Sequence, residues 1–169
     1  GCAPLTTTII DRSYGGTSTT WCLDYDTLTG TCNQPTALGD SFVYTYTTPG
    51  TYVIAQFVVD ACSADTAYKV ITVHPSPIAD FSHSGSACEG AMVNFLNLST
   101  TNSNTIAGYT WDFGDGTGTF LASPTHYYQQ PGTYNVCLTV ISTNGCEDSI
   151  CKSITIYSKP EVEFSFQNA

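Results

Sequence analysis

The sequence predicts an all-β protein made of two β-sandwich modules in tandem, followed by the first strand of a third repeat. Short segments alternate aromatic or aliphatic residues with polar ones, as Tyr109, Trp111 and Phe113 do, which is typical of half-buried strands. Turn signals such as Asp115-Gly116 and Pro131-Gly132 separate these segments. The third observation is an internal repeat of 82 or 83 residues, the length of one small sandwich.

The repeat places the boundaries of the modules. Three pairs of segments match, namely Thr48–Ile54 with Gln130–Val136, Lys69–Val73 with Lys152–Ile156, and Pro77–Ser82 with Pro160–Ser165. Short proline-containing linkers near residues 75–77 and 158–160 then divide the chain into module 1–75, module 76–158 and a C-terminal segment 159–169.

The second module is expected to contain six strands. The alternation predicts them at Ala79–Ser82, Met92–Ser99, Gly108–Phe113, Thr125–Gln129, Gly132–Ile141 and Ser149–Tyr157. Asn144-Gly145 predicts a tight hairpin between the last two. The first module is expected to be one strand short, because Gly1-Cys2 already lies beyond the position equivalent to 79–82.

The charge of the chain excludes two classes of partner. Four basic residues (Arg12, Lys69, Lys152 and Lys159) stand against fourteen acidic ones, which gives a formal charge of −10. Nucleic acids and anionic membrane surfaces are bound by clustered Lys and Arg, which this chain lacks. No apolar run in the sequence is long enough to span a bilayer. We therefore expect neither nucleic-acid binding nor membrane insertion.

Eight cysteines, four in each half of the chain, indicate an oxidising compartment and structural disulfides. None forms a Cys-x-x-Cys pair, so a zinc site is not expected. Folding the hairpin about residue 144 puts Cys137 opposite Cys151. Each set of four cysteines allows three pairings, and the predicted set is Cys2–Cys62, Cys22–Cys32, Cys88–Cys146 and Cys137–Cys151.

A run of motifs in the second module resembles a known family. Trp111-Asp112-Phe113-Gly114-Asp115-Gly116 is followed by His126-Tyr127-Tyr128 and by Pro131-Gly132-Thr133-Tyr134. This order is similar to the hallmark of the PKD domain, an immunoglobulin-like β-sandwich of extracellular proteins. The first module resembles the family in part, because Cys22-Leu23-Asp24-Tyr25-Asp26 stands there in place of the glycine turn. The resemblance implies a secreted or cell-surface location.

The arrangement of the cysteines adds a narrower resemblance. Cysteines before the second strand and at Asn144-Gly145-Cys146 are similar to those in tandem repeats of Bacteroidota surface and gliding-motility-associated adhesins. That similarity implies an exported spacer or adhesive stalk, in which stapled modules and brief linkers provide stiffness.

No catalytic constellation is visible in the sequence. The three histidines are His74, His83 and His126, and the last belongs to the family's His-x-Tyr motif, where a structural hydrogen bond is expected. The sequence contains no nucleophile elbow, no His-Glu-x-x-His and no phosphate loop. We therefore expect that the chain is not an enzyme and that it needs no cofactor.

Calcium is the candidate metal. Asp112 and Asp115, or Asp24 and Asp26 in the first module, offer the hard oxygen ligands that this ion prefers. The favoured alternative is that these carboxylates accept hydrogen bonds from backbone amides of their own turns, as Asp does in many chain reversals.

Aromatic and hydroxyl side chains provide two further candidates. Trp111 and Trp21 are expected in the core, whereas exposed tyrosines are candidates for stacking on sugars or contacting a protein. Three Asp-Ser/Thr-aliphatic segments resemble an O-glycosylation acceptor of exported Bacteroidota proteins. Their hydroxyl residues are Thr27, Thr66 and Ser149.

The C-terminal segment is a candidate for strand exchange. Val162, Phe164 and Phe166 would form the apolar face of a strand with no module of its own, while the first module is expected to offer an open sheet edge. Insertion of this strand into another molecule would build a head-to-tail fibre. The alternative is a piece of a longer tandem array with a disordered tail.

The sequence therefore favours an extracellular structural or adhesive module, such as a stalk, an adhesin or a fibre subunit. Its expected partners are other copies of itself, neighbouring repeats, and a cell-surface protein or polysaccharide. Two alternatives remain open: a filament that assembles by C-terminal strand donation, and an accessory substrate-binding module of a secreted hydrolase.

Overall fold

The computed structural model describes residues 1–35, 41–85, 87–102 and 105–167. Within these residues all regular secondary structure is β-strand, which confirms the all-β prediction. In this part of the chain no helix is long and apolar enough to cross a membrane. The chain divides into two compact units, Gly1–Pro75 and Ser76–Ala169, hereafter the first and second unit.

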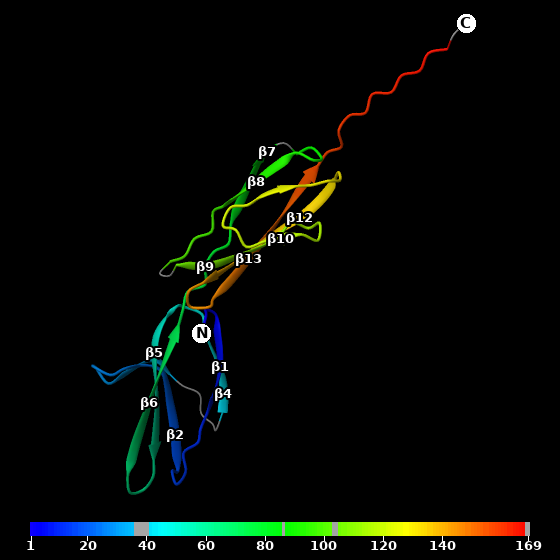
Figure 1. The fold of residues 1–169 in the computed structure, drawn as a ribbon. Helices are drawn as coiled ribbons and strands as arrows, with labels where there is room; N and C mark the ends of the chain where they lie inside the picture. Colours follow the sequence, from blue (N-terminus) through cyan, green and yellow to red (C-terminus); the bar gives the residue numbers. More distant parts are fainter. Residues whose placement is uncertain (36–40, 86, 103–104, 168–169) are drawn as a thin grey trace. The chain divides into compact units, whose positions relative to one another are not determined.

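The second unit is a sandwich of two antiparallel sheets (Figure 1). Its strands are β7 (Phe81–Gly85), β8 (Met92–Asn97), β9 (Ile106–Asp112), β10 (Gly118–Thr119), β11 (Thr125–Tyr127), β12 (Gly132–Ser142) and β13 (Glu147–Ile156). One sheet has the order β11-β8-β7 and the other the order β10-β9-β12-β13. The hairpin of β12 and β13 turns about Asn144-Gly145, at the predicted position.

Trp111 lies at the centre of the core of the second unit. The side chains of Phe81, Phe95 and Phe113 surround it, and its ring centroid lies 5.0 Å from that of Phe81 in an edge-to-face arrangement. The indole Nε1 donates a hydrogen bond of 2.9 Å to the carbonyl of Leu121. Trp111 thus serves as a core residue, as its place in the alternating strand predicts.

The first unit has a smaller core between two sheets. Its strands are β1 (Leu5–Ile10), β2 (Ser18–Asp26), β3 (Thr31–Pro35), β4 (Ser41–Tyr46), β5 (Gly50–Val59) and β6 (Ala64–Val73). β1 pairs with β4, and the second sheet has the order β3-β2-β5-β6. The buried cluster consists of Ile9, Trp21, Leu23, Tyr46, Ile54 and Val73.

The two units correspond strand by strand. β1 and β4 match β8 and β11, while β2, β5 and β6 match β9, β12 and β13. The correspondence extends to single hydrogen bonds, since Tyr52 Oη donates to the Thr48 carbonyl at 2.7 Å and Tyr134 Oη to the Gln130 carbonyl at 2.9 Å. β7 has no counterpart among the described residues of the first unit.

Two disulfides lie across neighbouring strands. Cys137 and Cys151 are direct partners in the β12–β13 pairing and are bonded to each other, as folding the hairpin about residue 144 predicts. Cys22 and Cys32 are also bonded and join β2 to β3. Each bond closes a short loop, of 14 and 10 residues respectively, within one sheet.

The predicted pair Cys2–Cys62 is wrong, because Cys62 is a free, exposed cysteine. The backbone of Cys2 forms an isolated β-bridge with that of His74, just after β6, whereas Cys62 lies in the turn before β6. The ten-residue strand between these positions is about 30 Å long, far more than a disulfide spans.

The predicted pair Cys88–Cys146 is wrong for the same reason. Cys88 is free and exposed, and its backbone forms an isolated β-bridge with that of Tyr157, just after β13. Cys146 lies in the turn before β13, at the other end of another ten-residue strand. Cys146 and Cys2 are both disulfide-bonded. The repeat correctly matched the positions of these cysteines, but it did not reveal that the two positions lie at opposite ends of a module.

Candidate functional site

The turn after β9 carries the most specific motif of the sequence. Asp112 Oδ1 accepts a hydrogen bond from the amide of Gly114 at 2.9 Å. Asp115 Oδ1 accepts from the amide of Thr117 at 3.0 Å and from its hydroxyl at 2.6 Å. Gly114 has a φ of +78°, and a Cβ at this position would come within 2.7 Å of the Asn135 carbonyl oxygen. The motif therefore specifies a close-packed turn.

His126 fixes this turn to β11. Its Nε2 lies 2.7 Å from Asp115 Oδ2, and its ring stacks on Phe113 with centroids 4.1 Å apart and an interplanar angle of 2°. Partial burial raises the pKa of Asp115, but the hydrogen bonds from Thr117 and His126 outweigh this effect and bring the pKa below its ordinary value. The role of His126 in this arrangement is structural.

The four aspartates predicted as calcium ligands lie in two separate places, Asp112 and Asp115 at the turn after β9, and Asp24 and Asp26 at the end of β2. Asp112 and Asp115 make the contacts described above, and Asp26 accepts hydrogen bonds from the amide of Leu28 and the hydroxyl of Thr29, both at 2.8 Å. The hydroxyl of Thr29 is the main cause of the lowered pKa of Asp26. No group of three or more His, Cys, Asp or Glu side chains with metal-binding geometry occurs within the described ranges. The carboxylates of Asp26, Asp112 and Asp115 thus accept hydrogen bonds within their own turns.

The predicted glycosylation residues differ in exposure. Thr27, in the turn between β2 and β3, and Ser149, on β13, are exposed. Thr66, on β6, is half-buried. Both tryptophans are buried in their cores, so neither forms part of a surface platform.

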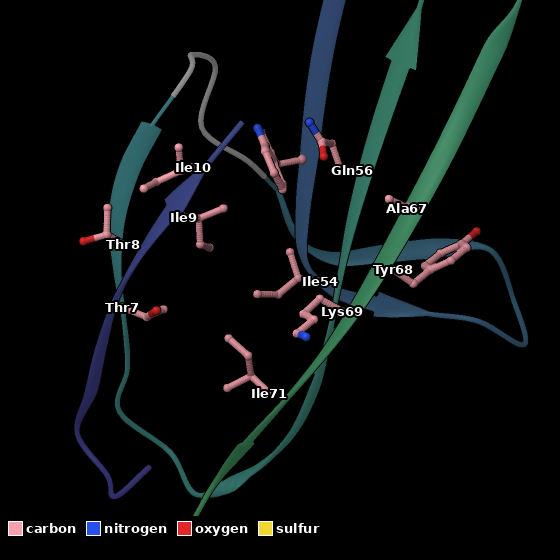
Figure 2. Close-up of a pocket in the computed structure, with 11 residues that line it drawn as sticks. Thr7, Thr8, Ile9, Ile10, Ile54, Gln56, Ala67, Tyr68, Lys69 and Ile71 are labelled. Atoms are coloured by element: carbon pink, nitrogen blue, oxygen red, sulfur yellow. The ribbon is translucent and has the colours of Figure 1, made fainter. Parts of the chain in front are cut away.

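An apolar groove opens in the first unit between β1 and β6, the free edges of its two sheets (Figure 2). Figure 2 shows Ile9 of β1 and Ile54 and Ile71 of the facing sheet pointing into this space. Trp21 and Lys69 also line the groove, whose volume is about 380 Å³. Sequence reasoning predicted an open edge in this module but did not find the groove.

Two polar groups of the groove have no partner in the described parts of the chain. Trp21 is 7% exposed, and its indole Nε1 has no hydrogen-bond acceptor there. Lys69 forms no ion pair there, although its counterpart Lys152 on β13 lies 2.6 Å from Asp80. The sequence repeat already contained this signal, because it matches Lys69 with Lys152 but matches Asp80 only with Glu163 of the C-terminal segment.

The C-terminal residues predicted for strand exchange are unpaired within the described structure. Residues 158–167 belong to no strand and are exposed. Val162, Phe164 and Phe166 have exposed fractions of 90%, 82% and 79%. Apolar side chains so fully exposed on a short extended segment are typical of a surface that another chain covers.

Comparison with known proteins identifies the family of the second unit. The family model described as the PKD domain matches residues 74–157. The chain is 39% identical to collagenase ColA of Bacillus cereus over 62 residues, which is 37% of this chain and 6% of that protein. It is 35% identical to the pre-pro-metalloprotease PrtV of Vibrio cholerae over 88 residues, which is 52% of this chain and 9% of that protein. The chain thus contains a PKD domain, a module that is itself non-catalytic.

The chain is also similar to a domain of known structure. The crystal structure of the PKD1 domain of Vibrio cholerae PrtV has 34% sequence identity and a TM-score of 0.44, and the match covers 48% of this chain and 96% of that domain. The chain spans less than a tenth of the length of the two relatives named above. Because these relatives are a collagenase and a metalloprotease, the narrower resemblance to Bacteroidota adhesins stays a prediction.

Proposed function

We propose that this chain is an extracellular, non-catalytic module that spaces or holds other parts of a larger assembly. The PKD domain at residues 74–157, stapled by a cross-strand disulfide, is the observation that carries the proposal. Disulfides persist in oxidising compartments, and the relatives that share this domain are a collagenase and a metalloprotease. Chemistry, in this proposal, resides in other domains or partners.

Stiffness is the mechanical basis of the spacer role. Within each unit a disulfide joins neighbouring strands, so local opening of the sheet is restrained at that point. Short proline-containing linkers limit bending between modules. Cell-surface protein and polysaccharide remain the proposed partners, reached through weak contacts of loops and outer sheet faces.

Substrate holding is a second candidate, supported by the relatives and by one outer sheet face. Met92 of β8 and Tyr127 of β11 are direct cross-strand partners, and with Leu96 they are about half exposed on this face. An exposed ring beside aliphatic side chains provides a surface on which a sugar ring or an apolar peptide side chain packs. This face would hold an insoluble substrate near a catalytic domain.

A pull-down on insoluble collagen, chitin and cellulose distinguishes the two roles. A pure spacer stays in the supernatant with all three materials. A substrate-holding module binds one of them, and Tyr127→Ala then lowers the bound fraction by about fivefold or more, because stacking contacts contribute about 1 kcal/mol or more. Tyr14→Ala is the matched control, since Tyr14 is 98% exposed but lies in the other unit. Equal loss with both variants contradicts the proposed face.

Calcium and glycans are not required in this proposal. The aspartate turns are already satisfied by backbone amides, so EDTA is expected to leave the thermal unfolding midpoint unchanged within about 1 °C relative to millimolar calcium. A clear rise of the midpoint with calcium contradicts this expectation. Intact mass of protein isolated from its source tests the acceptors Thr27, Thr66 and Ser149, because each glycan adds a discrete mass.

A further inference from the structure

In the second unit, β7 closes the side of the sandwich. Phe81 is 1% exposed and packs edge-to-face on Trp111. Lys152 on β13 covers it, with Nζ 5.0 Å from the ring centroid and 2.6 Å from Asp80, and Nζ also donates to the carbonyl of Phe81. Just before β7, the amide of Ala79 donates to Asp148 Oδ2 at 2.8 Å. One strand thus fills the gap between the edges β8 and β13.

The groove of the first unit lies at the same place in its sandwich. It opens between β1 and β6, the counterparts of β8 and β13. Trp21 and Ile9 occupy the positions of Trp111 and Phe95, and Lys69 occupies that of Lys152. The three side chains that contact Phe81 in the second unit, Trp111, Phe95 and Lys152, therefore have counterparts here, but no described residue of the first unit takes the place of the strand.

The C-terminal segment repeats the sequence of β7 and the residues before it. Pro160–Ser165 matches Pro77–Ser82, so Glu163 stands for Asp80 and Phe164 stands for Phe81. In β7, Phe81 and His83 lie on the same face and both rings lie near Phe95, and their counterparts are Phe164 and Phe166. The segment therefore offers the apolar face and the carboxylate that the groove lacks.

The course of the chain determines which molecule supplies the strand. The chain enters the second unit beside Asp148, where Ala79 is bound, and leaves it after Tyr157. These two points are nine residues apart along β13, a distance of about 30 Å. A segment of ten residues would use nearly its whole length to return to the point of entry, which favours insertion into a second molecule.

We propose that the groove of the first unit binds residues 161–167 of a second copy of this chain as an additional strand, antiparallel to β1. Phe164 packs on Trp21 and Ile9, and Glu163 forms an ion pair with Lys69, as Asp80 does with Lys152. Because donor and acceptor surfaces differ, repeated insertion builds a head-to-tail filament. This assembly is independent of the proposed spacer role, and either can fail without the other.

Sedimentation velocity of the full chain over a concentration series is the test. Cys62 and Cys88 are alkylated beforehand, so that disulfide exchange does not contribute. The wild type is expected to associate with rising concentration, and Phe164→Asp is expected to weaken association about tenfold to a hundredfold, because a buried phenyl ring is lost. Leu28→Asp is the matched control, since Leu28 is 95% exposed in a turn outside both surfaces and its replacement should change nothing.

Charge exchange and mixing test the proposed geometry. Lys69→Glu and Glu163→Lys should each weaken association, and the double variant should restore it. An equal mixture of the Phe164→Asp and Lys69→Glu chains should form dimers and no longer species, because one chain retains the acceptor and the other retains the donor. Thermal unfolding of each variant checks that it is folded, and a peptide of residues 160–167 should bind the folded Phe164→Asp chain. A wild type that stays monomeric up to about 1 mM, or a Phe164→Asp chain that associates like the control, overturns the proposal.

Discussion

Tyr46 and Tyr128 hold equivalent places in the two units, and each places its hydroxyl group inside the fold. Tyr46 Oη donates to the Leu23 carbonyl at 3.2 Å and Tyr128 Oη to the Phe113 carbonyl at 3.0 Å. Burial raises the pKa of Tyr46 to about 12 and also raises that of Tyr128. A raised pKa contributes stability that is fully present below pH 10 and is lost as the pH rises through the folded value. Both hydroxyls should therefore ionise only near alkaline unfolding.

Removing one of these hydroxyls has a predictable cost. Tyr128→Phe keeps the ring in the core but leaves the Phe113 carbonyl without its donor, so we expect a loss of about 1–2 kcal/mol in the free energy of unfolding. Urea unfolding followed by tryptophan fluorescence measures this loss. Tyr127→Phe is the control, because Tyr127 is half exposed. Equal effects of the two substitutions would contradict the structural role of the Tyr128 hydroxyl.

The aspartates of the turns make the fold sensitive to acid. Hydrogen bonds lower the pKa of Asp26 and Asp80, and those on Asp115 outweigh the opposite effect of its burial. A lowered pKa contributes stability that is present above the unfolded value of 3.8 and is lost as the pH falls through the folded value. Unfolding free energy measured in urea should therefore be constant from pH 7 to about pH 5 and should decrease below about pH 4. Asp115→Asn should flatten part of this decrease, and an unchanged profile would argue against the Asp115 contacts.

At the scale of the element, the β12–β13 hairpin is stabilised by a bond between its strands. Replacing both Cys137 and Cys151 by serine should lower the free energy of unfolding of the second unit by about 3 kcal/mol, because a loop of 14 residues is no longer closed in the unfolded chain. Differential scanning calorimetry measures the shift. The Cys22→Ser/Cys32→Ser variant is the control and should lower the transition of the first unit instead. A shift of the same transition by both variants would contradict two separately stapled units.

The sequence predicted elements well where a local signal fixed the pairing. Asn144-Gly145 set the hairpin, and with it the opposition of Cys137 and Cys151. β10 was missed because a strand of two residues leaves no alternation to detect. The predicted disulfides Cys2–Cys62 and Cys88–Cys146 were wrong because a sequence match says which positions are equivalent in the two modules, but not how far apart two positions of one module lie. The groove was not predicted from the sequence, because it depends on the absence of a strand between two sheet edges, β1 and β6, that are distant in sequence.

At the scale of the whole molecule, the state of the cysteines is a direct check on the fold. Six of the eight cysteines are disulfide-bonded, and Cys62 and Cys88 are exposed thiols. A thiol reagent should therefore label two groups per molecule without denaturant, and Cys62→Ser should reduce the number to one. Mass spectrometry of the labelled protein counts them. Four reactive thiols, or none, would contradict the pairing described above.

The same cross-strand bonds determine how the molecule responds to a pulling force. A fully extended chain gains about 3.3–3.6 Å per residue, but residues enclosed between two bonded cysteines cannot straighten. The loops closed by Cys22–Cys32 and Cys137–Cys151 contain 10 and 14 residues, so together they withhold about 80 Å of contour length. A tether under load would thus lengthen less when it yields, and a reducing agent would return the length that these two loops withhold.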